Sequence, residues 1–200
     1  MAGYLSRVTT ILLARHGETD WNREHRWQGH ADPPLNDRGR EQAAELARRL
    51  AGIRIDAVYS SDLARARETA ELVAAAIGIA VVVDPALREI DVGEWRGLTT
   101  TEIEARFPDG YRRHAGGGDG WQNGETHAAM SARIVEAVGR IAEAHPGGDV
   151  LSVLHGGVMR ALLAHASGVD LAEYRLAQRG PVNGSVARIA VEDGIFRRID

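Results

Sequence analysis

Short runs of apolar and β-branched residues alternate along the chain with longer segments in which apolar residues recur every three or four positions. The short runs are typical of buried strands, and the three-to-four spacing is typical of helices with one buried face. Strands that alternate with helices favour a largely parallel α/β sheet. We expect one domain over residues 1–200, because no repeat, linker or change of composition divides the chain.

The pattern also predicts where the elements lie. Strands are expected over 8–14, 55–60, 79–83 and 150–154, and a closing hairpin over 185–191 and 195–199. Helices are expected over 36–51, 63–77, 99–108, 126–144 and 158–166, with a shorter one from Asp170. Asn36 is a suitable N-cap, Gly78 a suitable helix end, and Thr99 with Glu102 has capping-box spacing.

The composition excludes some classes of function and agrees with the predicted α/β fold. Apolar residues make up 44% and charged residues 26% of the chain, as is ordinary for a globular domain. The net charge of -4 argues against binding to nucleic acid or an anionic membrane through a general positive field. The absence of cysteine excludes disulfides, thiolate metal sites and thiol nucleophiles. Because no signal-peptide core or membrane-spanning apolar run is found, we expect a cytoplasmic protein.

Two of the predicted strands end in the same way. The first leads into Arg15-His16-Gly17, and the strand over 150–154 leads into His155-Gly156-Gly157. Ligands of α/β sheets bind beyond the carboxyl ends of the strands, and a glycine there lets the backbone approach a ligand closely. A single histidine in such a place is more often a hydrogen-bonded core or turn residue. Two of them favour a functional site, provided that their strands are adjacent and parallel.

Charged residues follow two further strands. Arg65 and Arg67 fall on the first turns of the helix after the strand over 55–60, and Glu89 follows the strand over 79–83. Each alone has an ordinary explanation as a solvated surface residue. Together with the two histidines they supply what cleavage of a phosphate ester needs. Arginine matches phosphate oxygens, a neutral imidazole can attack phosphorus, and a carboxyl group can protonate the leaving oxygen.

The motifs around these strand ends extend further along the chain. They are Arg15-His16-Gly17-Glu18-Thr19, Asn22, Trp27-Gln28-Gly29, residues 35–43, 61–66 and 87–95, and His155-Gly156-Gly157. In this order, over about residues 10–185, they resemble the histidine phosphatase superfamily, also called the phosphoglycerate mutase-like family. The resemblance implies an α/β three-layer sandwich, in which helices flank a mostly parallel central sheet.

The resemblance also implies roles for individual residues. His16 would be the phosphorylated nucleophile, and Glu89 the general acid and then the base that activates water. Arg15, Arg65 and His155 would surround the phosphoryl group. The substrate-binding groups implied are Asn22, Gln28, Gly29 and the backbone N–H of Gly156. Arg65 is preferred to Arg67 and Arg88 because it precedes Ala66 as in the family.

No metal or cofactor is expected. There is no His-Glu-x-x-His motif, and the segment 116–124 is a glycine-rich loop without the Gly-Lys-Ser/Thr of a Walker loop. We expect this loop to be mobile and the remaining histidines, His114 and His127 among them, to lie mostly on the surface. Whether Trp27, Trp95, Trp121 and Tyr111 pack in the core or line the pocket stays open.

Three functions are compatible with these residues. The leading one is a phosphomonoester hydrolase of the histidine acid phosphatase type, acting on a small phosphorylated metabolite. The second is a phosphoglycerate mutase primed by 2,3-bisphosphoglycerate, although the 66 positions from Glu89 to His155 (155 minus 89) are few for the additional segment that mutases carry. The third is an inactive relative that binds phosphorylated ligands, which is disfavoured because His16 and Glu89 are both present.

Overall fold

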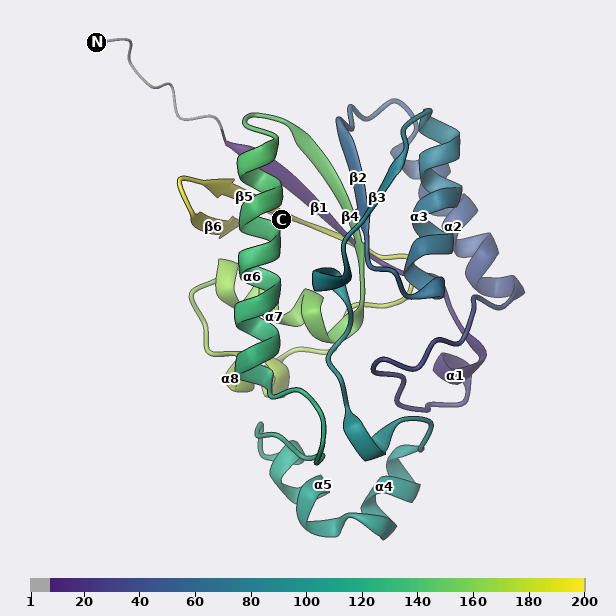
Figure 1. Ribbon diagram of the computed structural model, residues 1–200, viewed down its shortest axis with the longest axis vertical. Helices are drawn as coiled ribbons and strands as arrows, with labels where there is room; N and C mark the ends of the chain where they lie inside the picture. Colours follow the sequence, from purple (N-terminus) through teal and green to yellow (C-terminus); the bar gives the residue numbers. More distant parts are fainter. Residues whose placement is uncertain (1–7, 200) are drawn as a thin grey trace.

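Six strands form one sheet in the order β3-β2-β4-β1-β5-β6 (Figure 1). The computed structural model describes residues 8–199. The strands are β1 (Thr9–Arg15), β2 (Ala57–Ser60), β3 (Val81–Val83), β4 (Asp149–Leu154), β5 (Val186–Glu192) and β6 (Ile195–Arg198). Strands β1 to β4 are parallel, and β5 and β6 continue the sheet as an antiparallel hairpin. The predicted, largely parallel sheet and its closing hairpin are confirmed.

Helices cover both faces of this sheet, so the predicted three-layer sandwich is also confirmed. The helices are α1 (Asp20–Arg23), α2 (Asp37–Leu50), α3 (Ala64–Ile77), α4 (Thr100–Arg106), α5 (Pro108–Ala115), α6 (His127–Ala144), α7 (Gly156–Ala166) and α8 (Leu171–Ala177), with 3-10 turns η1 (Pro85–Leu87) and η2 (Gly93–Trp95). Helices α2 and α3 cover one face, and α6 and α7 cover the other (Figure 1). Helices α4 and α5 lie beyond one end of the sheet.

Strand β1 lies inside the sheet, and its sequence shows why. Ile11 and Leu13 belong to the hydrophobic cluster under α6 and α7, while Leu12 and Ala14 belong to the cluster under α2 and α3. A strand buried on both faces needs apolar residues at every position rather than at alternate ones. Burial of each large side chain contributes about 1.5–3 kcal/mol, which holds the end of the strand in a fixed position.

Strands β1 and β4 are adjacent and parallel, with Arg15 paired to Leu154. His16 and His155 therefore follow directly after paired residues. This is the arrangement that the two His-Gly turns required, and it is confirmed.

Several predicted boundaries are wrong by about two residues, each for a local reason. Strand β2 begins at Ala57, where its pairing with Val150 of β4 starts, although the N–H of Asp56 already bonds to the carbonyl of Asp149. Strand β3 begins late because the N–H of Ile79 closes the end of α3 on Ala74.

Pro108, predicted to end a helix, instead begins the helix α5 that the prediction missed. Proline suits the first helical position because its missing N–H would have no partner in the helix there. The predicted capping box is confirmed, since Thr99 and Glu102 exchange both hydrogen bonds at the start of α4.

No helix between residues 8 and 199 is long and apolar enough to cross a bilayer. Residues 1–7, part of the segment predicted to lack a signal peptide, lie outside the described residues.

Candidate active site

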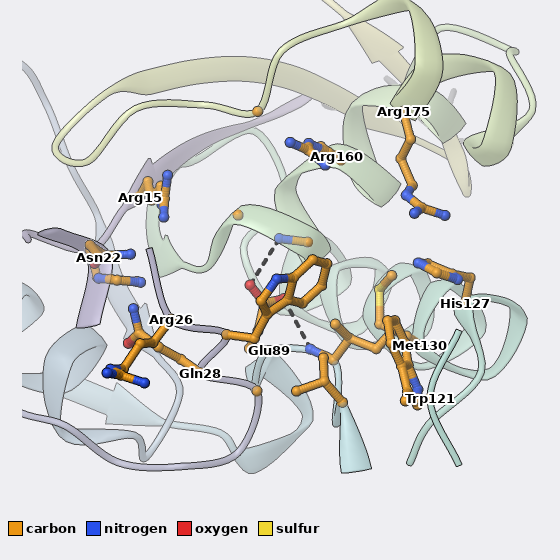
Figure 2. A pocket seen from close by; sticks show the side chains of 18 of the residues that line it. Arg15, Asn22, Arg26, Gln28, Glu89, Trp121, His127, Met130, Arg160 and Arg175 are labelled. Atoms are coloured by element: carbon orange, nitrogen blue, oxygen red, sulfur yellow. Dashed lines mark hydrogen bonds between the residues drawn. The ribbon is translucent and has the colours of Figure 1, made fainter. Parts of the chain in front are cut away.

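A pocket of about 210 Å³ opens where β1, β2 and β4 end (Figure 2). Eight of the nine predicted site residues line it, namely Arg15, His16, Asn22, Gln28, Gly29, Arg65, Glu89 and Gly156. The ninth, His155, lies with its ring centre 5.1 Å from that of His16. Arg67 and Arg88 do not line the pocket, and pair instead with Glu71 and Asp62. The fold thus brings all nine residues together from six separate stretches of the chain.

His16 is held in one tautomer. Its Nδ1 lies 2.7 Å from the carbonyl oxygen of Gly17, which can only accept, so Nδ1 carries the proton and Nε2 keeps its lone pair. Burial lowers the pKa of His16 well below 6.5, and the neighbouring charges of Arg65 and Arg15 lower it further. The side chain is therefore a neutral imidazole at physiological pH, the form able to attack phosphorus.

His155 is fully buried, and its Nε2 lies 2.7 Å from the hydroxyl of Ser61. Burial lowers the pKa of His155 well below 6.5, with the charge of Arg65 as the next cause. Among residues 8–199 the Nδ1 of His155 has no hydrogen-bond partner. A buried polar atom without a partner is costly, so this ring nitrogen is a candidate group for binding a ligand oxygen.

Two buried guanidinium groups supply positive charge. Arg65 is 1% exposed and donates to the carbonyl oxygens of Ala31 and Gly29 at 2.7 and 2.9 Å. Arg15 donates to the carbonyl oxygen of Pro181 at 2.6 Å. Burial lowers the pKa of Arg65 to about 10 and also lowers the pKa of Arg15, so both stay charged at neutral pH. Because carbonyl oxygens orient these groups without neutralising them, their charge remains available to an anion.

Asn22 and Asn183 organise the loop after β1. The amide oxygen of Asn22 accepts hydrogen bonds from Thr19 and from Asn183, which leaves its NH₂ group to donate to a ligand. Asn183 also donates to the carbonyl oxygens of His16 and Gly17 at 2.9 and 3.2 Å. Sequence analysis missed Asn183 because it lies 167 positions after His16 and reaches it only through the pairing of β5 with β1.

The carboxylate of Glu89 is fixed at the N-terminus of α7 (Figure 2). It accepts the N–H of Gly157 at 2.9 Å, that of Val158 at 3.3 Å and that of Ile90 at 3.0 Å. The bonds from Gly157 and Val158 satisfy N–H groups that have no partner within the helix. They also explain why α7 begins at Gly156, two residues before the predicted start, since its cap comes from a distant residue.

Arg133 of α6 supports the loop that carries Glu89. Its guanidinium donates to the carbonyl oxygens of Ala86 and Arg88 at 2.7 and 3.0 Å and pairs with Glu125 at 2.6 Å. Arg133 is a second residue that sequence analysis missed, because nothing in its helix marks it as different from a solvated arginine.

Glycines allow close approaches around the pocket. A Cβ at Gly157 would lie 2.4 Å from Oε1 of Glu89. Gly29 has a φ of +48°, and a Cβ there would lie 2.7 Å from the side chain of Val92. Gln28 is 9% exposed, and its Oε1 has no hydrogen-bond partner among residues 8–199. Gln28 is therefore free to bind a ligand donor.

The opposite part of the pocket corrects one expectation. His114 and His127 line it rather than lying on the surface, and burial lowers the pKa of His114 to about 3, with the charge of Arg175 as the next cause. The glycine-rich segment packs against the core, since Trp121 is only 8% exposed and Gly120 contacts Trp95.

The sequence left open whether Trp27, Trp95, Trp121 and Tyr111 pack in the core or line the pocket, and both positions occur. Trp27 and Trp121 line the pocket. Trp95 is fully buried, and Tyr111 is partly buried against the core.

In the described part of the chain, no three His, Cys, Asp or Glu side chains lie together in a way that could hold a metal ion. The positive charge of the pocket comes from arginine, with five arginines and one carboxylate among the lining residues.

Comparison with known proteins agrees with this geometry. The profile of the histidine phosphatase superfamily (branch 1) matches residues 11–198. The chain belongs to the histidine phosphatase superfamily. It is 41% identical over 161 residues to phosphoglycerate mutase-like protein 4 of Arabidopsis thaliana, covering 78% of this chain and 70% of that protein. It is 39% identical over 162 residues to the metal-independent phosphoserine phosphatase of the same plant, covering 78% and 68%.

Solved structures of this superfamily share the fold. YhfR of Bacillus stearothermophilus superposes with a TM-score of 0.89 at 37% identity, over 95% of each chain. The phosphoglycerate mutase-like fold that the sequence predicted is thereby confirmed.

Proposed function

We propose that this member of the superfamily is a phosphomonoesterase that hydrolyses small phosphate monoesters without a metal, through a phosphohistidine on His16. The observation that carries the proposal is the state of His16, which is buried, neutral and hydrogen-bonded through Nδ1 beside two charged arginines. The relative named as a metal-independent phosphoserine phosphatase supports the same reaction class.

In the first step, Nε2 of His16 attacks phosphorus as the bond from phosphorus to the ester oxygen breaks. Arg15 and Arg65 stabilise the charge on the phosphoryl oxygens, and His155 and Asn22 donate hydrogen bonds to them. Glu89, in its protonated form, gives its proton to the leaving oxygen. The products of this step are the free alcohol and phosphohistidine.

In the second step, Glu89 accepts a proton from water as the water oxygen attacks phosphorus and the bond from phosphorus to nitrogen breaks. Inorganic phosphate leaves, His16 is neutral again, and Glu89 holds the proton needed for the next turnover. The backbone N–H groups of Gly157 and Val158 keep the carboxyl group of Glu89 in place through both steps.

The first test is hydrolysis of p-nitrophenyl phosphate in excess EDTA by the wild type and by His16→Ala. We expect turnover that survives chelation and is lost in the variant. His165→Ala, which removes an exposed histidine of α7, is the matched control and should keep wild-type turnover. Activity that EDTA abolishes would refute the proposed mechanism.

The phosphoglycerate mutase is retained as a second candidate, because relatives carry that name. It differs in the fate of phosphohistidine, which would be transferred back to substrate instead of to water. With 3-phosphoglycerate and 2,3-bisphosphoglycerate, release of inorganic phosphate without isomerisation would favour the phosphatase. Isomerisation to 2-phosphoglycerate would favour the mutase. The cytoplasmic location stays a prediction.

A further inference from the structure

The pocket contains a second positively charged region, formed by Arg160 of α7 and Arg175 of α8. We call these two residues the distal arginine pair. Figure 2 shows them on one side of the pocket, with Arg15 and Asn22 on the other. None of the steps proposed above uses either of them, so their presence in the pocket needs a separate explanation.

The distal arginine pair lacks the close carboxylate partners that Arg26 at the rim of the pocket has. Arg26 at the rim, for comparison, pairs with Glu24 at 2.8 Å and with Glu102 at 3.2 Å. In the described part of the chain no such ion pair is formed by Arg160 or Arg175, and Nε of Arg160 is buried without any hydrogen-bond partner.

The contacts of Arg175 orient it without neutralising it. It donates to the carbonyl oxygen of Gly117 at 2.8 Å and to the ring of His114 at 3.0 Å. His114 is neutral, because its pKa is lowered to about 3 by burial and then by the charge of Arg175. The carboxylate that acts on Arg175 is that of Asp119, which is itself hydrogen-bonded to His127.

The electrostatics place Arg160 within range of both parts of the pocket. Burial is the largest cause of the lowered pKa of both Arg15 and Arg175. The positive charge of Arg160 also lowers both pKa values, and for Arg15 this effect comes after the opposing effect of Glu89. Partly buried like charges are unfavourable unless an anion compensates them. Although the net charge of the chain is -4, this pocket contains more arginines than the proposed binding of one phosphoryl group uses.

We propose that the distal arginine pair binds a second anionic group of the substrate, a carboxylate or a second phosphate, carried by the leaving group. This inference rests on the proposed phosphatase function, and it narrows the substrate class to small phosphate monoesters with two anionic ends. The planar guanidinium group suits either anion, because it donates two parallel hydrogen bonds to a pair of oxygens.

Gly180 is part of this arrangement. A Cβ at position 180 would lie 2.3 Å from Nη2 of Arg160. The glycine therefore leaves the space in which the guanidinium of Arg160 lies. Gly180→Ala should displace the guanidinium group of Arg160 while keeping its charge. This variant therefore tests whether the position of the charge matters, in addition to its presence.

The test uses matched pairs of substrates. The first arm uses three phosphorylated hydroxy acids, phosphoglycolate, 3-phosphoglycerate and 4-phosphoerythronate, which have two, three and four carbons. Each acid is compared with the compound that carries an alcohol in place of the carboxylate. A second arm compares 1,3-propanediol bisphosphate with the monophosphate. The arm with the larger preference identifies the anion as carboxylate or phosphate. p-Nitrophenyl phosphate, whose leaving group has no second anionic group, serves as reference.

We expect kcat/KM of the wild type to favour at least one doubly anionic substrate over its partner. Arg160→Met and Arg175→Met should each reduce that preference about 10- to 100-fold, the range for a charge-assisted hydrogen bond, and Gly180→Ala should reduce it in the same direction. All three variants should hydrolyse p-nitrophenyl phosphate within about 3-fold of wild type. Arg140→Met, which removes a charge from the exposed face of α6, is the control and should keep the preference.

Equal losses on doubly anionic substrates and on p-nitrophenyl phosphate would overturn the inference, since the arginines would then support the phosphoryl end or the fold. The absence of any preference in the wild type would also overturn it. Should the wild type hydrolyse nothing, the proposed function fails, and the inference is decided separately by calorimetric binding. In the His16→Ala background, D-3-phosphoglycerate should bind at least about 10-fold more tightly than sn-glycerol 1-phosphate, the alcohol of the same configuration. Adding Arg160→Met should abolish this difference.

Discussion

Replacing Gly157 with alanine moves the carboxylate of Glu89 without altering any group that is proposed to take part in the reaction. The new Cβ would lie 2.4 Å from Oε1 of Glu89, whereas ordinary contacts begin at 3.4 Å. The carboxylate must therefore withdraw by about 1 Å (3.4 minus 2.4). This displacement takes it away from the N–H groups of Gly157 and Val158 that hold it.

The expected loss of activity follows from that displacement. A misplacement of about 1 Å can cost about 100-fold in rate, and a general acid contributes about 100- to 10,000-fold. We therefore expect kcat/KM for an alkyl phosphate such as glycerol 2-phosphate to fall about 100-fold or more. The loss on p-nitrophenyl phosphate should be smaller, because p-nitrophenolate leaves readily without being protonated.

The fold should tolerate the change. Oε1 is the end of a flexible side chain, and alanine favours a helix over glycine by about 1 kcal/mol, which offsets part of the lost hydrogen bonding. The free energy of unfolding should fall by less than about 2 kcal/mol. Gly139→Ala in α6, where a Cβ would meet nothing within 4 Å, is the matched control and should leave activity unchanged.

Steady-state kinetics with both substrates and urea denaturation check these expectations. Wild-type activity of Gly157→Ala on glycerol 2-phosphate would refute the placement of Glu89 as the acid. Equal losses on both substrates would refute its role in protonating the leaving group. A large loss of stability would show that the contact is not relieved by the side chain.

Three further outcomes are expected. Asn183→Ala removes the donor to the carbonyl oxygens of His16 and Gly17 and one hydrogen bond to Asn22. We therefore expect kcat to fall about 10-fold, a loss of about 1.4 kcal/mol in transition-state stabilisation. Unchanged kinetics would contradict this role of Asn183. Arg133→Met breaks the ion pair with Glu125 and frees the loop before Glu89, so urea denaturation should show a loss of about 3 kcal/mol, against less than about 0.5 kcal/mol for the exposed Arg140→Met. The pKa values of His16 and His155 are lowered in the folded state, so below about pH 6.5 the unfolded chain binds protons that the folded chain does not. The free energy of unfolding should thus be highest above about pH 6.5 and fall as the pH drops, by up to about 1.4 kcal/mol per pH unit for each histidine. Urea denaturation at several pH values measures this fall, and its absence would contradict the burial of the two neutral rings.

The sequence by itself determined the elements whose causes are local. The unbroken apolar run of β1 reveals burial on both faces, and it is followed directly by Arg15-His16-Gly17. The caps at Asn36 and Thr99 depend on side chains within three residues of the N–H groups they bind. The order of motifs along the chain identified the family, and so the residues expected at the pocket.

Only the tertiary structure decided the contacts between residues far apart in the chain. Asn183 reaches His16 across 167 positions, and Glu89 caps α7 from 68 positions away. The lowered pKa values of the histidines depend on burial. That Arg160 and Arg175 form no ion pair within residues 8–199 depends on which side chains the fold leaves beside them. Sequence patterns record propensity and periodicity along the chain, whereas burial and charge pairing arise when separate segments meet, which is why these properties of the pocket had to come from the fold.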